Sequence, residues 1–465
     1  MKVEINNLGV IKQAEIDLKP LTVFIGNNGE GKTWAAYTLS AILGSYGYVN
    51  YQKAYFDGKN QQTYPPLDGA IDQIINEGNA QINLIQFAKE YGELYINDVA
   101  RLVPNWMQSF LGTERVNFEN LQVIFKLEES KQVFFERLKS ASIERKLSSG
   151  ILNALKESGE EILFFYTETE GNVNDKLPLK AIRQFVIKEI FQTIHRTFYA
   201  NELYIFPTER TTFITFPFGN IIDKQKMTKN DRDDSEINES ELGKTPLPGP
   251  VSHFLGTMLN ASRKSMSIRE EEIKENPRLD QYVKLANLLE DYILQGKLGF
   301  ETSKLRKELL FQPTVETKLE MPIVSSMVKE LAPLFLCLRD LVKPNEWLII
   351  DEPEMNLHPA AQVRIIEFLV MLVNAGLHVL ITTHSPYIVD HLANLMQGAK
   401  HDNPESIKEL FYLEKTESFI AQEKVGVYLF EEGTAKNILN DEGIINWETF
   451  GNVSNDLSGI YSQLL

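Results

Sequence analysis

The sequence predicts an α/β fold in which a mostly parallel sheet carries a site at one edge. Three observations lead to this prediction. An apolar run ends in a glycine-rich loop and continues into a helix-forming segment, Leu21 to Leu39. A second apolar run, Trp347 to Ile350, ends in two acidic residues, and a third, His378 to Thr383, ends in a histidine. Near-continuous apolar strands are typical of covered parallel sheets, which bind ligands at the carboxyl ends of their strands.

The first element is the segment Gly26-Asn27-Asn28-Gly29-Glu30-Gly31-Lys32-Thr33, which fits the pattern G-x-x-x-x-G-K-[ST]. Glycines allow backbone N–H groups to turn toward phosphates, and a helix N-terminus favours negative charge. Lys32 is suited to reach the β- and γ-phosphates, and Thr33 to ligate Mg²⁺. A turn that fits by chance is the alternative. The strand before the loop and the helix after it favour a phosphate-binding loop.

Composition limits the class of protein. The chain has 465 residues, of which 43% are hydrophobic and 24% charged, as in an ordinary soluble protein of about two to four domains. The net charge of −17 argues against a surface covered by nucleic acid. Local basic clusters at Lys304, Arg306 and Lys307 and at Arg263 and Lys264 leave DNA binding open, although such clusters are usually solvated helix faces.

Nothing in the sequence predicts a membrane segment or a secreted protein. No apolar stretch reaches the roughly 20 residues that a membrane span needs, and the first residues lack the apolar core of a signal peptide. Cys337 is the single cysteine, within an apolar run, so we interpret it as a small core residue; a lone catalytic thiol is the alternative. We expect a cytoplasmic protein.

The chain between these motifs changes character several times. Two short strands are expected before the loop, Val3 to Leu8 and Ala14 to Leu18. The predicted organisation is a first lobe at 1–45, a mostly helical insertion at 46–201 with strand-like pieces at 121–127 and 162–166, a returning strand at 202–220, a flexible polar loop at 221–250, a helical segment at 251–300, a second lobe at 301–390, and strands (410–413 and 425–430) with a terminal helix (453–464) within 391–465.

The acidic strand supplies the groups that the loop lacks. Asp351 is suited to hold Mg²⁺, directly or through water, and Glu352 to orient and deprotonate an attacking water. His384 follows the next strand and is suited to donate a hydrogen bond to a γ-phosphate. A histidine at a strand end is more often structural by itself, but its position behind the loop and the acidic strand favours a functional role.

The order of these motifs resembles the ATP-binding-cassette ATPases, specifically the SMC/RecF/OLD-like group, whose two lobes are split by a long helical insertion. The matching segments are Gly26 to Thr33 (Walker A), Ile349 to Glu352 (Walker B), Glu354 to Pro359 (D-loop) and His384 (switch histidine). The resemblance covers residues 1–45 and 300–390, and extends to 203–216. It implies a P-loop ATPase head that uses ATP and Mg²⁺.

One motif departs from the family pattern. The family's signature usually contains Leu-Ser-Gly-Gly, and the corresponding stretch here is Val324 to Glu330, in which Ser325 is kept but the glycines are absent. The resemblance implies that Ser325 meets the γ-phosphate bound by a second copy, in a head-to-tail dimer or higher oligomer. Helix capping alone is the alternative role for this serine. The glutamine of the family's Q-loop is not assigned in this sequence. Glu209-Arg210 is our candidate for a comparable region, and a strand-end ion pair is the alternative.

We therefore expect an ATP-hydrolysing dimer or oligomer that controls a partner effector. Stand-alone ATPases that this chain resembles often belong to bacterial anti-phage or toxin-like systems, so the resemblance implies a separately encoded partner such as a nuclease or toxin. No acidic cluster of the Toprim nuclease type is found in the C-terminal segment. A RecF/SMC-like DNA-repair ATPase and an ATP-gated scaffold that does not hydrolyse ATP remain alternatives, and a membrane-transporter cassette fits the long insertion poorly.

Overall fold

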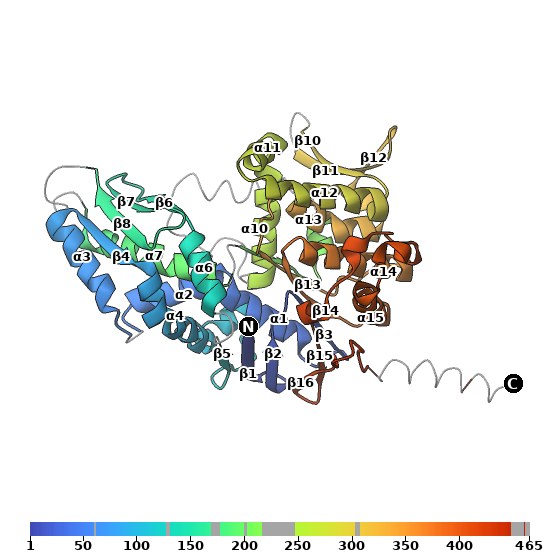
Figure 1. Cartoon of the computed structure of the whole chain (residues 1–465), viewed down its shortest axis with the longest axis horizontal. Helices are drawn as coiled ribbons and strands as arrows, with labels where there is room; N and C mark the ends of the chain where they lie inside the picture. Colours follow the sequence, from blue (N-terminus) through green and yellow to red (C-terminus); the bar gives the residue numbers. More distant parts are fainter. Residues whose placement is uncertain are drawn as a thin grey trace. The chain divides into compact units, whose positions relative to one another are not determined.

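The computed structural model describes residues 1–59, 62–126, 131–168, 177–199, 202–215, 247–302, 307–447 and 460. The chain forms two compact units (Figure 1). Unit 1 comprises residues 1–7, 38–107 and 118–203, and unit 2 comprises 8–37, 108–117 and 204–465. Most of the polar loop expected at 221–250, and the helix expected at 453–464, lie outside the described residues.

Unit 1 combines helices with a four-stranded antiparallel sheet. The strands lie in the order β4-β8-β7-β6, and the separate strand β1 pairs antiparallel with β5. Its elements are β1 (Lys2–Leu8), α2 (Ser45–Phe56), α3 (Pro65–Glu77), β4 (Asn79–Asn83), α4 (Leu84–Arg101), β5 (Gln122–Lys126), α6 (Lys131–Ser140), β6 (Ile143–Lys146), β7 (Leu152–Lys156), β8 (Ile162–Thr167) and α7 (Leu179–Phe198). The strands at 79–83, 143–146 and 152–156 were not expected from the sequence.

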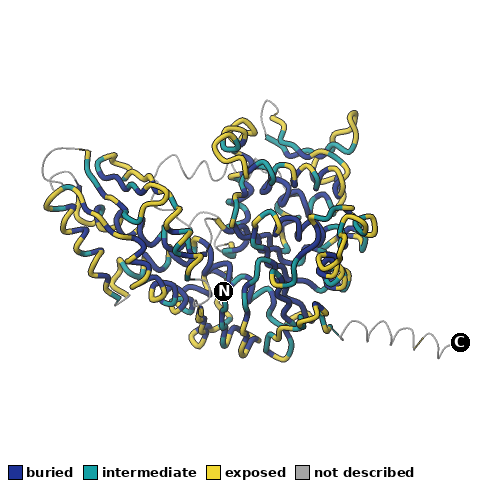
Figure 2. The backbone as a smooth tube through the Cα atoms, viewed as in Figure 1, coloured by how far each residue is buried: buried dark blue, intermediate teal, exposed yellow. Residues whose placement is uncertain are grey.

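Unit 2 is built on a sheet in which the strands lie in the order β2-β16-β15-β3-β14-β13-β9. Strand β3 pairs in parallel with β14 on one side and β15 on the other, and β13 pairs in parallel with β14. The strands are β2 (Ile11–Asp17), β3 (Leu21–Gly26), β9 (Leu203–Phe206), β13 (Trp347–Asp351), β14 (His378–Thr383), β15 (Val425–Glu431) and β16 (Thr434–Asn437). Strands β3 and β13 are buried along their whole length (Figure 2).

The helices of unit 2 share one core with these strands. Side chains from β3, β13, β14 and the helices between them form a single buried cluster. The remaining elements are α1 (Lys32–Leu43), which runs on into unit 1, α5 (Met107–Leu111), α8 (Arg210–Thr215), α10 (Gly249–Arg263), α11 (Met266–Glu275), α12 (Asp280–Leu288), α13 (Ser326–Asp340), α14 (Pro359–Asn374), α15 (Pro386–Lys400), and a small sheet of β10 (Lys297–Thr302), β11 (Lys307–Thr314) and β12 (Thr317–Glu320).

Two expected strands differ from the structure. The returning strand expected at 202–220 is only β9, because Arg210–Thr215 forms helix α8. Residues 410–413 do not form a strand. The backbone N–H groups of Tyr412 and Leu413 donate instead to the side-chain carboxylate of Glu367, at 2.9 and 2.7 Å, so a buried acid takes the place of a neighbouring strand.

Candidate functional site

The glycine-rich loop follows β3 and leads into helix α1, which begins at Lys32. Gly26 has a φ of +138°, and a Cβ there would lie 2.3 Å from the carbonyl oxygen of Phe430 on β15. Gly31 has a φ of +92°, and a Cβ there would lie 2.7 Å from Cγ1 of Ile11. Both positions therefore require glycine, for backbone conformation and for lack of space.

Lys32 lies folded along this loop. Its side chain is 4% exposed, and its ammonium group donates to the backbone oxygens of Gly26 at 2.9 Å and Asn27 at 2.8 Å. Burial lowers the pKa of Lys32, and the nearby carboxylates of Glu352 and Asp351 oppose this shift. Asn27, Asn28 and Gly29 are exposed and Glu30 is half-buried, so the outer side of the loop is open to solvent.

Asp351 ends strand β13 and joins the loop to the acidic strand. The hydroxyl of Thr33 donates to its Oδ1 at 3.0 Å, although the two residues are 318 positions apart. Thr382 also donates to Oδ1, and the hydroxyl of Tyr37 donates to Oδ2 at 3.1 Å. Burial raises the pKa of Asp351, while these three hydrogen bonds favour its charged form.

Glu352 and His384 form the second pair of the site. The Nε2 atom of His384 lies 3.1 Å from Oε1 of Glu352, and this contact lowers the pKa of Glu352. Glu352 has a φ of +49°, in the left-handed region, which few residues other than glycine adopt. Its backbone N–H donates to the carbonyl oxygen of Thr382 at 3.1 Å. Both side chains remain about a third exposed and can meet a ligand.

Glu354 holds the turn that carries His384. Its Oε1 accepts from the Thr383 hydroxyl and from the His384 backbone N–H, both at 2.7 Å. Burial raises the pKa of this carboxyl group. Its Oε2 is buried, and within the described part of the chain it has no hydrogen-bond partner. Glu354 thus fixes the backbone next to His384, and its Oε2 accepts no hydrogen bond within the described residues.

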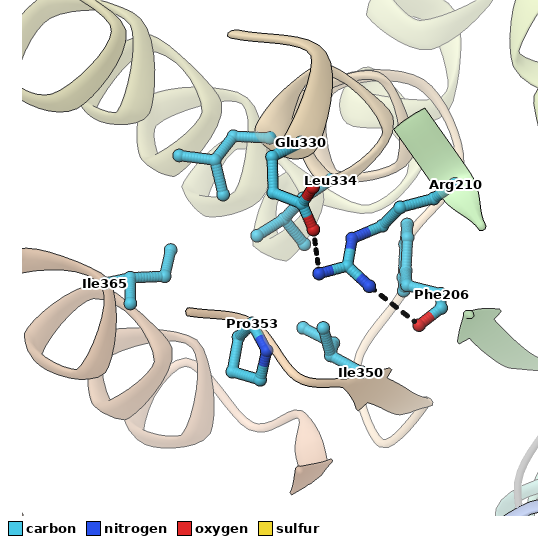
Figure 3. A pocket seen from close by; sticks show the side chains of 8 residues that line it. Phe206, Arg210, Glu330, Leu334, Ile350, Pro353 and Ile365 are labelled. Atoms are coloured by element: carbon cyan, nitrogen blue, oxygen red, sulfur yellow. Dashed lines mark hydrogen bonds and ion pairs between the residues drawn. The ribbon is translucent and has the colours of Figure 1, made fainter. Parts of the chain in front are cut away.

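Arg210 reaches the same strand end from helix α8. Its guanidinium donates to the backbone oxygens of Asp351 at 2.6 Å and Glu352 at 2.8 Å, and forms an ion pair with Glu330 of helix α13. Figure 3 shows the Arg210–Glu330 pair in a small cavity lined by apolar side chains. Arg210 is 2% exposed, so its charge is buried. The neighbouring Glu209 is exposed and does not share this position.

Ser325 occupies the N-cap of helix α13. Its hydroxyl accepts a hydrogen bond from the Val328 backbone N–H at 3.4 Å, and its side chain is exposed. The capping role considered from the sequence is therefore observed. Contact with a nucleotide on a second copy stays a prediction.

The structure brings together five of the residues that the sequence singled out: Lys32, Thr33, Asp351, Glu352 and His384. It adds three that sequence reasoning did not assign to this site: Tyr37, Glu330 and Thr382. Arg210, which the sequence offered as a candidate for the Q-loop region, joins the site through its two carbonyl contacts. The sequence contained one signal for these additional residues: two polar residues, Thr382 and Thr383, stand together at the end of an otherwise apolar strand.

The donor set suits Mg²⁺. Thr33 and Asp351 offer two oxygen donors within 3.0 Å of each other, and Mg²⁺ usually takes one or two protein ligands and completes its octahedron with water and phosphate oxygens. Within residues 1–447 as far as they are described, no cluster of three or more His, Cys, Asp or Glu side chains is arranged to hold a metal by itself. No helix of the described chain has the length and apolar character of a membrane span.

Comparison with known proteins gives three results. A model of the AAA ATPase domain family matches residues 1–389. Old nuclease of Escherichia phage P2 is 39% identical over 79 residues, which are 15% of this chain and only 14% of Old nuclease. Among solved structures, the SmcHead bound to the C-winged helix domain of ScpA matches with a TM-score of 0.37 and 12% identity, covering 94% of this chain and 96% of that one. The SMC head domain from Thermotoga maritima matches with a TM-score of 0.30 and 10% identity, covering 94% and 97%.

Proposed function

We propose that this chain, which belongs to the AAA ATPase domain family, binds ATP with Mg²⁺ and hydrolyses it to ADP and phosphate. The observation that carries the proposal is the contact between Thr33 and Asp351, at 3.0 Å, beside the Glu352–His384 pair. Three strands of one parallel sheet deliver these groups to the same edge. The arrangement combines a loop suited to bind phosphate, two oxygen donors suited to bind a metal ion, and a carboxylate suited to activate a water molecule.

Each group has a separate task in this mechanism. Lys32 and the N–H groups at the start of α1 stabilise charge on the transferring phosphoryl group. Thr33 and Asp351 would hold Mg²⁺, which when bound neutralises charge on the phosphate oxygens. Glu352 orients the attacking water and accepts its proton. Because the His384 contact lowers the pKa of Glu352, this carboxyl group is ionised and able to act as a base at neutral pH.

The test compares phosphate release from Mg-ATP by the wild-type chain and by Glu352→Gln. We expect the substitution to lower turnover by about 100-fold or more and to leave ATP affinity nearly unchanged, since a base acts in the transition state. Glu405→Gln is a matched control, because Glu405 is an exposed acid that pairs with Lys408. Equal and negligible turnover in wild type and Glu352→Gln, together with the same oligomer of both proteins in ATP, would overturn hydrolysis and favour an ATP-gated scaffold.

We further propose that ATP closes a head-to-tail dimer or higher oligomer that controls an effector protein in anti-phage defence. Two features support this: the partial similarity to Old nuclease of a phage, and the exposed Ser325 at the start of helix α13. The effector would be a separately encoded nuclease or toxin. Light scattering of Glu352→Gln with and without ATP tests the assembly, and a doubling of mass that requires ATP is the expected result.

Phage challenge of cells that carry the gene with its neighbours tests the biological role. We expect the wild-type locus to lower plaque counts and Glu352→Gln to restore them. No protection by the wild-type locus, together with salt-sensitive, ATP-enhanced binding of the purified chain to duplex DNA, would favour a DNA-repair ATPase of the RecF/SMC kind instead.

A further inference from the structure

The Arg210–Glu330 pair is buried where a charge is costly. The Glu330 side chain is fully buried, and six apolar residues complete the cavity around the pair: Phe206, Leu331, Leu334, Ile350, Pro353 and Ile365 (Figure 3). Burial raises the pKa of Glu330 to about 7, against the attraction of Arg210. Buried ion pairs of this kind are often no more stable than apolar replacements of the same volume. A contribution to the stability of the fold therefore does not by itself explain why the Arg210–Glu330 ion pair is present.

The contacts of Arg210 point to another role. One nitrogen of its guanidinium donates to the Asp351 carbonyl and the other to the Glu352 carbonyl, so a single planar group holds two consecutive peptide units. From the opposite side, the Glu352 N–H is held by the carbonyl oxygen of Thr382. Between these contacts Glu352 adopts its left-handed conformation, which costs about 1 kcal/mol or more unless the surroundings enforce it.

We propose that Arg210 is a positioning residue for Glu352. Its guanidinium fixes the main chain of Asp351 and Glu352, and thereby the direction in which the Glu352 carboxylate meets water. Glu330 in turn orients the guanidinium and ties this main chain to helix α13, the helix that Ser325 caps. A lysine cannot replace this fork, because it offers one compact charge in place of a planar set of donors. The inference rests on the hydrolytic role proposed for Glu352.

The first test measures kcat, KM, ATP affinity and thermal stability in Arg210→Met and Arg210→Lys. We expect kcat to fall by about 100-fold in Arg210→Met, because a displacement of about 1 Å at a reacting group has an effect of this size. ATP affinity and KM should change little, and Arg210→Lys should recover only a small part of kcat. Arg269→Met is the matched control, since Arg269 is equally buried and donates to a backbone carbonyl, that of Val342, away from the site.

The second test separates positioning from folding. The double variant Arg210→Met/Glu330→Met replaces the buried pair by apolar side chains, so it should be at least as stable as wild type. If Arg210 has a purely structural role, both the thermal stability and the kcat of the double variant should return to the wild-type level. If Arg210 positions Glu352, the stability of the double variant should return to that level and its kcat should stay low. The proposal would be overturned if Arg210→Met, or the double variant, had a kcat as high as that of the control Arg269→Met.

A third measurement does not need turnover. Hydrogen–deuterium exchange of the peptide spanning 348–356 should be faster in Arg210→Met and in the double variant than in wild type, and unchanged in Arg269→Met. Absence of turnover in the wild type would defeat the proposed hydrolysis alone, since the exchange result still decides whether Arg210 holds this peptide. Unchanged exchange in both Arg210 variants would defeat the positioning role alone.

Discussion

The two units bury polar side chains in different ways. In unit 1 several buried polar groups belong to aromatic side chains that pair with one another. The hydroxyls of Tyr51 and Tyr64 are 2.5 Å apart, and the Tyr95 hydroxyl lies 3.3 Å from Nδ1 of His195, whose Nε2 donates to the Gly44 carbonyl at 3.0 Å. These groups satisfy each other and favour stability.

Unit 2 instead gathers buried acids at the edge of its sheet. Burial raises the pKa of Asp351, Glu354 and Glu330, because the surroundings of each group disfavour its charged form. Buried acids with raised pKa values that gather at one place are typical of functional sites. We therefore expect substitutions in the aromatic cluster of unit 1 to change stability, and substitutions at the edge of the unit 2 sheet to change activity.

Asp351→Asn should give the largest effect. Loss of the carboxylate that we propose to hold Mg²⁺ is expected to lower Mg-ATP turnover by about 10³-fold, while the free energy of unfolding stays equal or rises because a buried charge is removed. Phosphate release and urea unfolding measure the two quantities. Asp340→Asn is the control: Asp340 is buried and pairs with Arg339 elsewhere in unit 2, so its loss should reduce stability and spare turnover. The opposite pattern would contradict the comparison.

Phe191→Ala should strongly destabilise unit 1. Phe191 is fully buried, stacks on Tyr95 with ring centroids 4.8 Å apart, and contacts Tyr51 and Tyr64 edge-on. Truncating such a ring costs about 3–5 kcal/mol. Hydrogen exchange of helices α4 and α7 measures the loss, and Phe164→Ala, at an exposed ring on β8, should change exchange little. Equal effects of the two substitutions would show that the aromatic cluster is not the core of this unit.

Acid should destabilise both units through one histidine each. Burial lowers the pKa of His195 in unit 1 and of His253 in unit 2 to about 4, below the ordinary value of 6.5. Between these values the unfolded chain binds more protons than the folded one, so stability falls as pH falls. Each histidine should account for about 2 kcal/mol between pH 7 and 5. Urea unfolding of His195→Gln and His253→Gln should show a weaker pH dependence, and an unaltered one would contradict the assignment.

Ser325→Ala should have the smallest effect on stability. Loss of an N-cap costs about 1 kcal/mol, and Ser265→Ala provides the control because Ser265 caps α11 with the same 3.4 Å bond to a backbone N–H. Both variants should therefore lose similar stability. Only Ser325→Ala should weaken ATP-dependent self-association, as measured by light scattering in the Glu352→Gln background. If both variants associate like the parent, Ser325 is a cap and nothing more.

The sequence predicted the ATPase class and the main site residues because each motif is local. The class is confirmed by the family match over residues 1–389. A phosphate loop, two acids after an apolar strand and a histidine after another strand are each visible within ten residues. The fold brings these motifs close together in space, because β3, β14 and β13 pair in parallel and end at the same edge of the sheet.

Other features could not be predicted because their partners are distant or their patterns are broken. Strand β7 carries Asn153 and Lys156 at buried positions, and Lys156 donates to the backbone oxygens of Lys139 and Ala141, so no apolar alternation marked it. Strand β15 was expected only as part of a separate C-terminal pair. Arg210 is visible in the sequence as a charged residue after a strand, but its carbonyl partners lie 141 and 142 positions away.

The place of β15 in the sheet has a consequence for how the protein is made. Strand β3 leaves the ribosome early, yet its two parallel neighbours, β14 and β15, are synthesised about 350 and 400 residues later. At about 5–20 residues per second, this segment waits roughly 20–80 s for its second neighbour. Since the carbonyl of Phe430 packs against Gly26, the nucleotide loop is framed on both sides only once the ribosome has passed residue 430. A nascent chain is therefore unable to complete the frame around this loop until residue 430 has been translated.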